Sequence, residues 1–174
     1  MPDVRASVAV RPRRPDDLPA LVAVLAAQQP GSGYPMRWPL PFPAEEFVVR
    51  PGERAAWVAE HEGRVVGHVS VTDVPPDLAG AFARPAPEPA PAMVAVLYVD
   101  PATQGTGTGG LLLDRAVAWI RDAGLRPVLD VAPSHPRALA VYRRRGWVEV
   151  GTARPDWLRA DRPDLILMEL PLRR

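Results

Sequence analysis

The chain has 174 residues, no Cys, and 21 basic against 20 acidic residues, so its net charge is +1. This length predicts a single domain over residues 1–174. Disulfides and thiolate–metal sites are excluded, and so small a net charge offers no strong field to nucleic acid. His61, His68 and His135 lack the HxxxH or HxH spacing of a zinc site, so we expect no metal. The chain has neither a long apolar run nor the apolar region of a secretory signal, which predicts a cytoplasmic protein that does not enter a membrane.

The first part of the chain predicts a strand, a helix and an irregular connection. Ser7–Val10 predicts a short strand that ends at Arg11. Apolar residues then repeat at i, i+3, i+4 and i+7, which predicts an amphipathic helix. These residues are Leu18, Leu21, Val22 and Leu25. The stretch Gln28–Pro43 is crowded with Pro and Gly, so we expect an irregular connection, followed by a brief helix over Ala44–Val49.

A hairpin and a Pro-rich segment come next. The apolar stretches Ala55–Glu60 and Val65–Thr72 predict two strands, and Gly63 supplies the positive φ that the turn between them needs. Prolines crowd Pro75–Ala92. We therefore expect a mobile loop there, with neither a helix nor an inner strand.

The second half of the chain predicts alternating strands and helices. Met93–Val99 is a continuous apolar run, typical of a strand that is buried on both faces. A helix over Leu111–Ala123 follows, with Gly124 as its C-cap. The remaining predicted elements are a strand at Pro127–Ala132, a helix at Pro136–Arg145 capped by Ser134 and closed by Gly146, and strands at Trp147–Thr152 and Asp164–Leu170. The whole pattern predicts an α/β fold, with a mixed, twisted sheet of about six to seven strands and helices on both faces.

A glycine-rich loop lies between the strand Met93–Val99 and the next helix. It carries Gly105, Gly107, Gly109 and Gly110 within six positions. Backbone N–H groups that lack a neighbouring side chain can approach an anion, and the N-terminus of the following helix adds a positive dipole. The loop therefore predicts a phosphate or pyrophosphate ligand.

Two classes of nucleotide-binding protein are compatible with this loop. Gly105, Gly107 and Gly110 match the dinucleotide fingerprint GxGxxG, and Asp130 stands 20 residues beyond, where a ribose-binding acid is expected. Against this interpretation, Asp100–Gln104 separates the strand from the first glycine, and a hairpin precedes the loop instead of βαβ units. The chain after the loop is also too short for the rest of a doubly wound sheet. An NAD-binding domain is the less favoured alternative.

Two motifs point to another family. Gln104-x-x-Gly107-x-Gly109, after a buried strand, resembles the acetyl-CoA signature of the GCN5-related N-acetyltransferase (GNAT) family. Ala138-x-x-x-Tyr142-x-x-x-Gly146-Trp147 resembles the second signature of that family, with Trp in place of Phe. The resemblance implies a GNAT-like domain that transfers the acetyl group of acetyl-CoA to a primary amine of a small molecule or a peptide N-terminus. A homodimer is compatible with it, and a non-catalytic acyl-CoA-binding module is a second alternative.

The resemblance also implies which residues bind the cofactor. A backbone N–H near the end of the signature strand polarises the thioester carbonyl, and the glycine loop holds the phosphates. The residues expected to bind acetyl-CoA are Leu97, Tyr98, Val99, Gln104, Gly105, Thr106, Gly107, Thr108, Gly109, Gly110, His135 and Ala138. His135 stands where the family often has Asn.

The catalytic residues follow from the chemistry of the implied reaction, and the resemblance implies the acceptor-binding residues. Tyr142 is the expected general acid for the leaving thiolate. His68 is the expected base because its ordinary pKa of ~6.5 suits work near neutrality. Asp73, Glu60 and a water relay are its rivals, because the strand Met93–Val99 carries no acid. The residues expected to line the acceptor pocket are Tyr34, Arg37 and Trp38.

Overall fold

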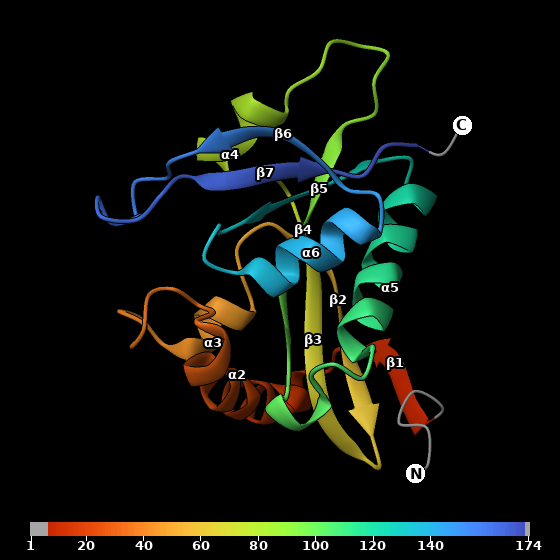
Figure 1. The fold of residues 1–174 in the computed structure, drawn as a ribbon. Helices are drawn as coiled ribbons and strands as arrows, with labels where there is room; N and C mark the ends of the chain where they lie inside the picture. Colours follow the sequence, from red (N-terminus) through yellow and green to blue (C-terminus); the bar gives the residue numbers. More distant parts are fainter. Residues whose placement is uncertain (1–6, 173–174) are drawn as a thin grey trace. The chain divides into compact units, whose positions relative to one another are not determined.

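The computed structural model describes residues 7–172 and contains a seven-stranded mixed sheet in the order β1-β2-β3-β4-β5-β7-β6 (Figure 1). The strands are β1 (Val8–Pro12), β2 (Glu53–His61), β3 (Arg64–Thr72), β4 (Pro91–Val99), β5 (Arg126–Val131), β6 (Val148–Ala153) and β7 (Leu165–Glu169). The helices are α2 (Leu18–Ser32), α3 (Ala44–Val48), α4 (Pro76–Phe82), α5 (Thr108–Asp122) and α6 (Pro136–Arg144), with 3-10 turns η1 (Pro15–Asp17) and η2 (Pro101–Thr103). The predicted α/β class is confirmed.

The chain divides into two compact units. The first holds the residues up to Thr72 together with Val94–Trp119, and the second holds Asp73–Met93 together with the residues from Ile120 onward. The boundaries therefore fall within β4 and within α5. The single domain expected from the length stays a prediction.

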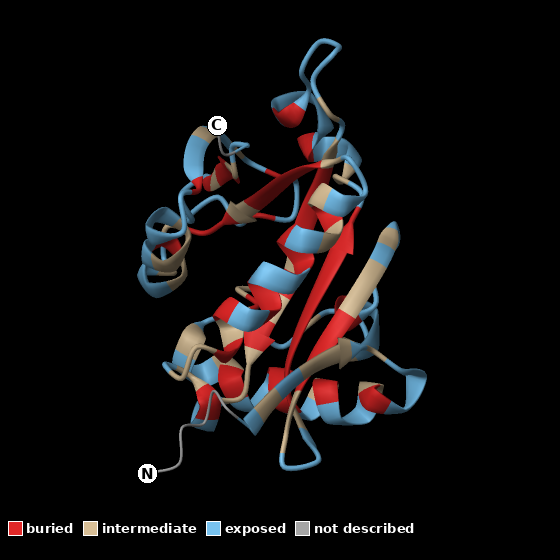
Figure 2. Ribbon diagram, turned by 90° about the vertical axis from the view of Figure 1, so that its right-hand side faces the viewer, coloured by how far each residue is buried: buried red, intermediate tan, exposed pale blue. Residues whose placement is uncertain are grey.

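The hairpin of the first unit forms where the sequence predicts it. β2 and β3 pair antiparallel from Glu53↔Thr72 to His61↔Arg64. The two turn residues, Glu62 and Gly63, have φ of 50° and 74°, as the tight hairpin turns that match strand twist require. From Val66 to Thr72 every residue of β3 is buried, and the strand lies in the interior of the sheet (Figure 2).

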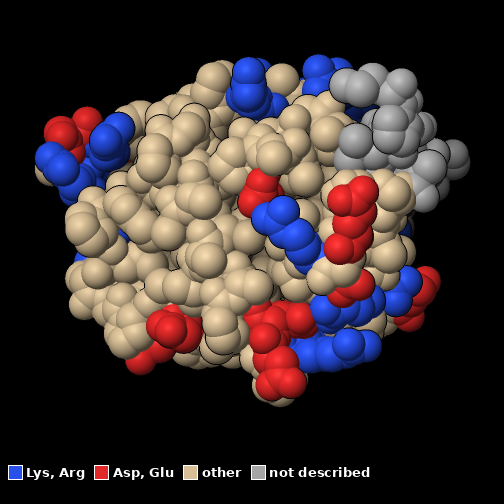
Figure 3. Space-filling view, turned by 90° about the horizontal axis from the view of Figure 1, so that it is seen from below, with Lys and Arg blue, Asp and Glu red and all other residues tan. Residues whose placement is uncertain are grey.

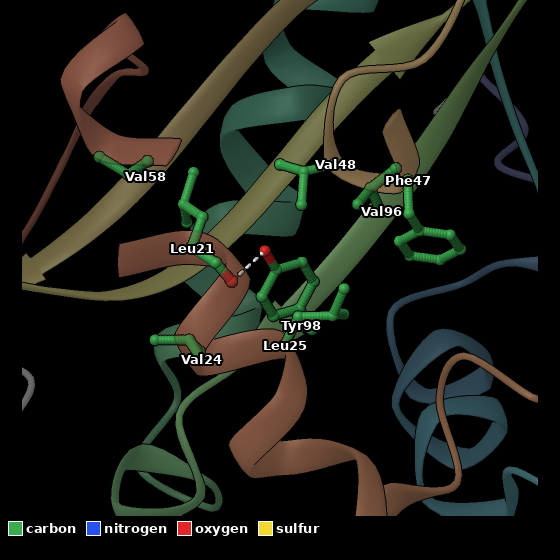
Figure 4. Close-up of a cluster of buried hydrophobic side chains, with 8 residues drawn as sticks. All are labelled: Leu21, Val24, Leu25, Phe47, Val48, Val58, Val96 and Tyr98. Carbon is green, nitrogen blue, oxygen red and sulfur yellow. Dashed lines mark hydrogen bonds between the residues drawn. The ribbon is translucent and has the colours of Figure 1, made fainter. Parts of the chain in front are cut away.

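The main core of the first unit lies between α2, α3 and one face of the sheet (Figure 4). It is formed by the buried side chains Leu21, Val24, Leu25, Phe47, Val48, Val58, Val96 and Tyr98. Successive residues of a strand point to opposite faces, so the neighbours of these strand residues face α5 instead. A Cβ placed on Gly67 would come within 2.9 Å of Leu112 Cδ1, which shows how closely α5 approaches β3.

Helix α2 is longer than the sequence predicts. It continues through Pro30 to Ser32 and ends at Gly33, which has a φ of 72° and donates its N–H to Gln29 O. The buried Gln28 side chain donates to Leu25 O at 3.1 Å and also to Tyr34 O. These bonds to backbone carbonyls stabilise the last turn of the helix, so the irregular connection begins after Ser32 and not at Gln28.

Helix α5 confirms the predicted apolar face and begins earlier than expected. It starts at Thr108 instead of Leu111, and Gly124 follows its end with a φ of 72°. The apolar residues of the predicted face are all buried: Leu112, Leu113, Ala116, Val117 and Ile120. The first turn was missed because its residues, Thr108–Gly110, are poor helix formers that carry no periodic signal.

The Pro-rich segment of the second unit contains a helix that the sequence analysis excluded. Helix α4 begins with Pro75 as its N-cap and Pro76 in its first turn, and it buries Leu78 and Phe82. Proline is favoured in a first helical turn, where its missing N–H has no partner to lose and its φ is already helical. The expectation of a loop over the whole of Pro75–Ala92 was therefore wrong.

The rest of the second unit is a small sheet with α6. β7 pairs antiparallel with both β5 and β6, and β4 pairs with β5 in parallel over Pro91–Met93. The buried guanidinium of Arg126 donates to Glu169 Oε2 and to Phe82 O, both at 2.6 Å. The N-cap of α6 is His135 and not Ser134.

None of the helices in the described part of the chain is long and apolar enough to span a membrane. The cytoplasmic location expected from the sequence stays a prediction.

Candidate active site

The glycine loop follows directly from the end of β4. Asp100 donates its N–H to Val66 O at 2.7 Å, and its carboxylate accepts from the N–H of Ala102 at 2.9 Å. The 3-10 turn η2 comes next. Hydrogen bonds of Asp100 therefore fix the start of the loop to β3 and to η2.

The loop ends at the N-terminus of α5, which begins at Thr108. Gly105 and Gly107 have φ of 78° and 88°, a region that residues with a Cβ rarely adopt. Leu111 donates its N–H to Gly107 O at 3.1 Å. The earlier N–H groups of the helix, those of Thr108, Gly109 and Gly110, have no partner within it, because the first turn of any α-helix lacks the preceding carbonyls.

The residues of this loop fit a diphosphate group. An anion gains both from open N–H groups and from the positive end of the helix dipole. A Cβ added to Gly109 would meet only Val99 Cγ1 at 3.9 Å, which is an ordinary contact. Packing within the protein thus leaves room for a side chain at Gly109, which is half-buried between the buried residues Thr108 and Gly110.

Strand β4 is distorted immediately before the loop. Val96 has a φ of 52°, a left-handed conformation that is a true outlier for a β-branched residue. Tyr98 points towards the main core, where its hydroxyl donates to Leu21 O at 2.9 Å, and burial raises its pKa. Leu97 and Val99 flank Tyr98 and are only half-buried, so they lie on the opposite face. Of the predicted residues in β4, Leu97 and Val99 therefore have side chains that lie outside the main core.

His68 is fully buried on β3 and its ring is engaged at both nitrogens. Nδ1 lies 2.8 Å from Val96 O, and Nε2 lies 3.1 Å from Nη1 of Arg13. Burial lowers the pKa of His68 to about 4, against the smaller opposing effect of the Val96 carbonyl. A general base needs a free lone pair and a pKa near the working pH. The burial and pairing of His68 therefore argue against its role as the base, and the identity of the base stays a prediction.

Sequence reasoning missed the two residues that complete this cluster. Arg13 donates to both carboxylate oxygens of Glu53, at 2.9 and 2.5 Å, in addition to facing His68. These partners are 40 and 55 residues away from Arg13 in the sequence. No local pattern could have identified them.

The rival bases also have partners. Glu60 accepts from Nε of Arg11 at 2.9 Å, while Arg11 also forms a two-bond pair with Asp17. Glu60 and Asp17 line a pocket of about 540 Å³ in the first unit, together with Asp100. Asp73 is exposed at the start of the second unit.

The residues predicted to contact the acceptor lie between α2 and α3. The Tyr34 ring meets the Phe47 ring edge-on, with centroids 5.6 Å apart. Arg37 is exposed, and the exposed fraction of Trp38 is 38%. Two aromatic residues of this segment therefore differ in role, because Tyr34 packs onto the core while Trp38 faces solvent.

Tyr142, His135 and Ala138 belong to the second unit, on α6 or at its N-cap. The Tyr142 ring contacts the buried Trp147 edge-on at 6.0 Å between centroids. The Trp that replaces Phe in the second signature thus supports the Tyr ring. Asp130, the acid of the dinucleotide interpretation, lies in β5 and pairs with Leu167 of β7.

On the face seen in Figure 3, Arg and acidic side chains lie next to each other at the centre, at the lower right and along the margins, and a broad uncharged area lies between them. Within residues 7–172 no group of three or more His, Asp or Glu side chains is placed to hold a metal ion. The candidate site is therefore built from backbone donors and partly buried apolar residues.

Comparisons with known proteins agree with this geometry. The sequence profile described as "Acetyltransferase (GNAT) family" matches residues 22–147. No curated protein matches the chain in sequence.

Solved structures share the fold. The ribosomal-protein-S18-alanine N-acetyltransferase of Escherichia coli is 21% identical with a TM-score of 0.67, covering 94% of this chain and 93% of that one. The ribosomal-protein-alanine N-acetyltransferase of Brucella melitensis is 24% identical with a TM-score of 0.69, covering 94% of this chain and 99% of that one. Arabidopsis thaliana NAA60, solved in complex with acetyl-CoA, is 17% identical with a TM-score of 0.69, covering 93% of this chain and 98% of that one.

Proposed function

The chain belongs to the GNAT acetyltransferase family, and on that premise we propose that it is an N-acetyltransferase that uses acetyl-CoA. In the proposed reaction, the neutral primary amine of a small molecule or a peptide N-terminus attacks the thioester carbonyl directly. The observation that carries the proposal is the Gln104–Gly110 loop, which brings open backbone donors to the N-terminus of α5.

The loop binds the diphosphate of acetyl-CoA. The N–H groups of Thr108, Gly109 and Gly110 donate to its oxygens, and the dipole of α5 stabilises its negative charge. Each such charge-assisted hydrogen bond is worth roughly 1.5–3 kcal/mol. Binding at this position directs the thioester towards the distorted end of β4.

The end of β4 polarises the thioester carbonyl. A backbone N–H near Val99 donates to the carbonyl oxygen as negative charge develops on it. A backbone donor suits this task because it is already held in place before the reaction. Leu97 and Val99 lie on the strand face opposite Tyr98, so the cofactor meets apolar side chains there.

Tyr142 assists the departure of the thiolate. Its ordinary pKa of ~10 lies above the ~8.5 of a thiol, so complete proton transfer is uphill by about 2 kcal/mol. A hydrogen bond from the hydroxyl to the developing thiolate is therefore sufficient for its role. The support for this role is the second signature, in which Tyr142 stands four residues after Ala138.

The acceptor amine binds beside the segment between α2 and α3. Tyr34, Arg37 and Trp38 line its site, with Trp38 offering a partly exposed aromatic surface. The proton of the ammonium form passes to water, because His68 is locked and Glu60 is paired with Arg11. This assignment predicts a rate that rises with pH until the amine itself is neutral.

Calorimetric titration with CoA, acetyl-CoA and NAD, followed by an acetylation screen, tests the proposal. The screen uses acetyl-CoA with a panel of amino acids, polyamines and short peptides. We expect CoA binding and transfer to at least one amine. NAD binding without CoA binding would overturn the proposal in favour of a dinucleotide-binding domain, and CoA binding without turnover would favour an acyl-CoA-binding module.

A further inference from the structure

His68 contributes a buried hydrogen bond to the point at which β4 is distorted. Its ring has no exposed surface, and Nδ1 lies 2.8 Å from Val96 O. A carbonyl can only accept a hydrogen bond, so Nδ1 carries the proton. Arg13 can only donate, so Nε2, 3.1 Å from its Nη1, carries the lone pair. The two neighbours together select one neutral tautomer.

Val96 needs such a partner. Its φ of 52° is strained for a β-branched residue, and strained residues persist only where their surroundings hold them. The distortion turns its carbonyl towards the His68 ring. The register pairs that join β4 to β5 run from Pro91 to Met93, so all of them precede Val96.

Further contacts hold the ring of His68 in place. Glu53 accepts two hydrogen bonds from Arg13, which fixes the guanidinium that faces Nε2. On the other side, the Tyr98 ring stacks on the imidazole with centroids 5.7 Å apart and an angle of 28°. Tyr98 is in turn bound to Leu21 O of α2. The imidazole therefore joins β2, β3, β4 and α2.

We propose that His68 is a positioning residue, whose Nδ1–H holds the Val96 carbonyl and thereby directs the Leu97–Val99 backbone that polarises the thioester. This inference rests on the proposed function, since it concerns the same carbonyl. His68 does not touch the substrate. It acts through Val96, and Arg13 and Glu53 act through His68.

Two substitutions separate the hydrogen bond to Val96 from the bond to Arg13. The amide nitrogen of Asn stands as many bonds from Cα as Nδ1, so His68→Asn keeps a donor for Val96 O. The amide of Gln stands at the position of Nε2, so His68→Gln keeps an acceptor for Arg13 and loses the donor. Both variants lose the ring, so any loss of stability from packing affects both.

Turnover of acetyl-CoA with the amine panel is the first measurement. Removing a well-placed oxyanion donor reduces kcat roughly 10²–10³-fold, and a displaced donor retains part of that effect. We therefore expect kcat of His68→Gln to fall roughly 10-fold or more, with a KM for acetyl-CoA within about 3-fold of wild type. His68→Asn should recover most of kcat. Equal losses in both variants, or wild-type kcat in His68→Gln, would overturn the proposal.

Ser70→Ala is the matched control. Ser70 also lies buried on β3, and its hydroxyl donates to Ala95 O of β4 at 3.1 Å, one residue before the distortion. Its loss should lower the melting temperature and leave kcat unchanged. A fall in kcat equal to that of His68→Gln would show that any β3–β4 hydrogen bond has the same effect, and would contradict a specific role for His68.

Two measurements do not depend on turnover, and the first of them needs no variant of His68. The ¹⁵N shifts of the wild-type imidazole should identify the Nδ1–H tautomer, and an Nε2–H tautomer would overturn the proposal. Amide exchange of Leu97–Val99 should be faster in His68→Gln than in His68→Asn. If wild type binds CoA but acetylates no amine, the proposed function fails while these two results still decide whether His68 holds the strand. If wild type is active and His68→Gln is equally active, the function stands and the positioning role fails.

Discussion

The distorted end of β4 and the glycine loop that follows it satisfy their polar groups in opposite ways. Around Val96 the polar atoms of His68, Arg13 and Tyr98 have partners inside the first unit. Twelve to fourteen residues after Val96, Thr108–Gly110 present N–H groups that the helix itself cannot satisfy. The polar groups around Val96 are thus paired within the protein and form the closed region, whereas the N–H groups of Thr108–Gly110 have no partner within α5 and form the open region.

This difference suits the closed region to holding a fixed backbone conformation and the open region to binding a ligand. Buried polar groups that are fully paired hold a conformation, because breaking any bond leaves an unsatisfied partner. Open backbone donors at a helix N-terminus bind an anion because they lack such partners. The candidate site thus combines a strand that is fixed before the reaction with a loop that is completed by its ligand.

Substitution in the open region should have the largest effect. Gly109→Val places a side chain over the helix N-terminus and displaces the diphosphate from at least one N–H group, so we expect CoA affinity to fall roughly 10- to 100-fold. The space around Gly109 allows the variant to fold. Calorimetric titration with CoA measures the effect, and Gly80→Val on α4, also with open space around it, is the control. Normal CoA affinity in a folded Gly109→Val variant would contradict an open, anion-binding loop.

Lowering the pH should destabilise the protein through protonation of the buried His68. The pKa of His68 is about 4 in the folded protein against 6.5 as the ordinary value, so the unfolded chain binds more protons between these pH values. The contribution of neutral His68 to the free energy of unfolding is therefore complete above pH 6.5, and it is lost as the pH decreases towards 4. The difference between the two pKa values corresponds to a loss of about 3 kcal/mol in the free energy of unfolding.

Urea unfolding of wild type and His68→Asn at several pH values between 7 and 4 measures this contribution. The comparison removes the titration of carboxylates, which both proteins share. We expect the wild type to lose more free energy of unfolding than the variant over this range. Parallel curves would mean that His68 is protonated as easily in the folded protein as in the unfolded one.

Tyr142 tests whether a half-buried hydroxyl of the second unit takes part in the chemistry. Tyr142→Phe keeps the ring contact with Trp147, so the melting temperature should change little. If the hydroxyl donates to the departing thiolate, kcat should fall roughly 10- to 100-fold with little change in KM for acetyl-CoA. Steady-state kinetics and a melting curve measured together decide this. Wild-type turnover would leave Tyr142 with a packing role only.

The smallest effect is expected at a paired surface carboxylate. Glu60 is bound to Arg11 and partly exposed, and such ion pairs contribute about 1 kcal/mol or less. Glu60→Gln should therefore change kcat less than about 2-fold and stability only slightly. Initial rates across pH measure it. A large fall in kcat that is greatest at low pH would instead identify Glu60 as the base.

The outcome of the predictions depended on how local each feature is. The hairpin turn at Gly63 and the apolar face of α5 were predicted correctly, because each is defined by neighbouring residues. Helix α4 was missed because the number of prolines was considered and their position at the helix start was not. The burial of His68 was not foreseen, because the ordinary pKa of a histidine carries no information about its surroundings.

The sequence by itself determined the order of the strands, the position of the glycine-rich loop before α5 and the resemblance to the GNAT family. These depend on spacing along the chain, on glycine at positive φ and on apolar periodicity, and all three act over a few residues. Only the tertiary structure decided that His68 is buried with a partner at each ring nitrogen. Its partners Val96 and Arg13 are 28 and 55 residues away, and the same side chain could have been a base on an exposed strand. Burial and long-range pairing set the protonation state of a residue, and neither is visible before the chain has folded.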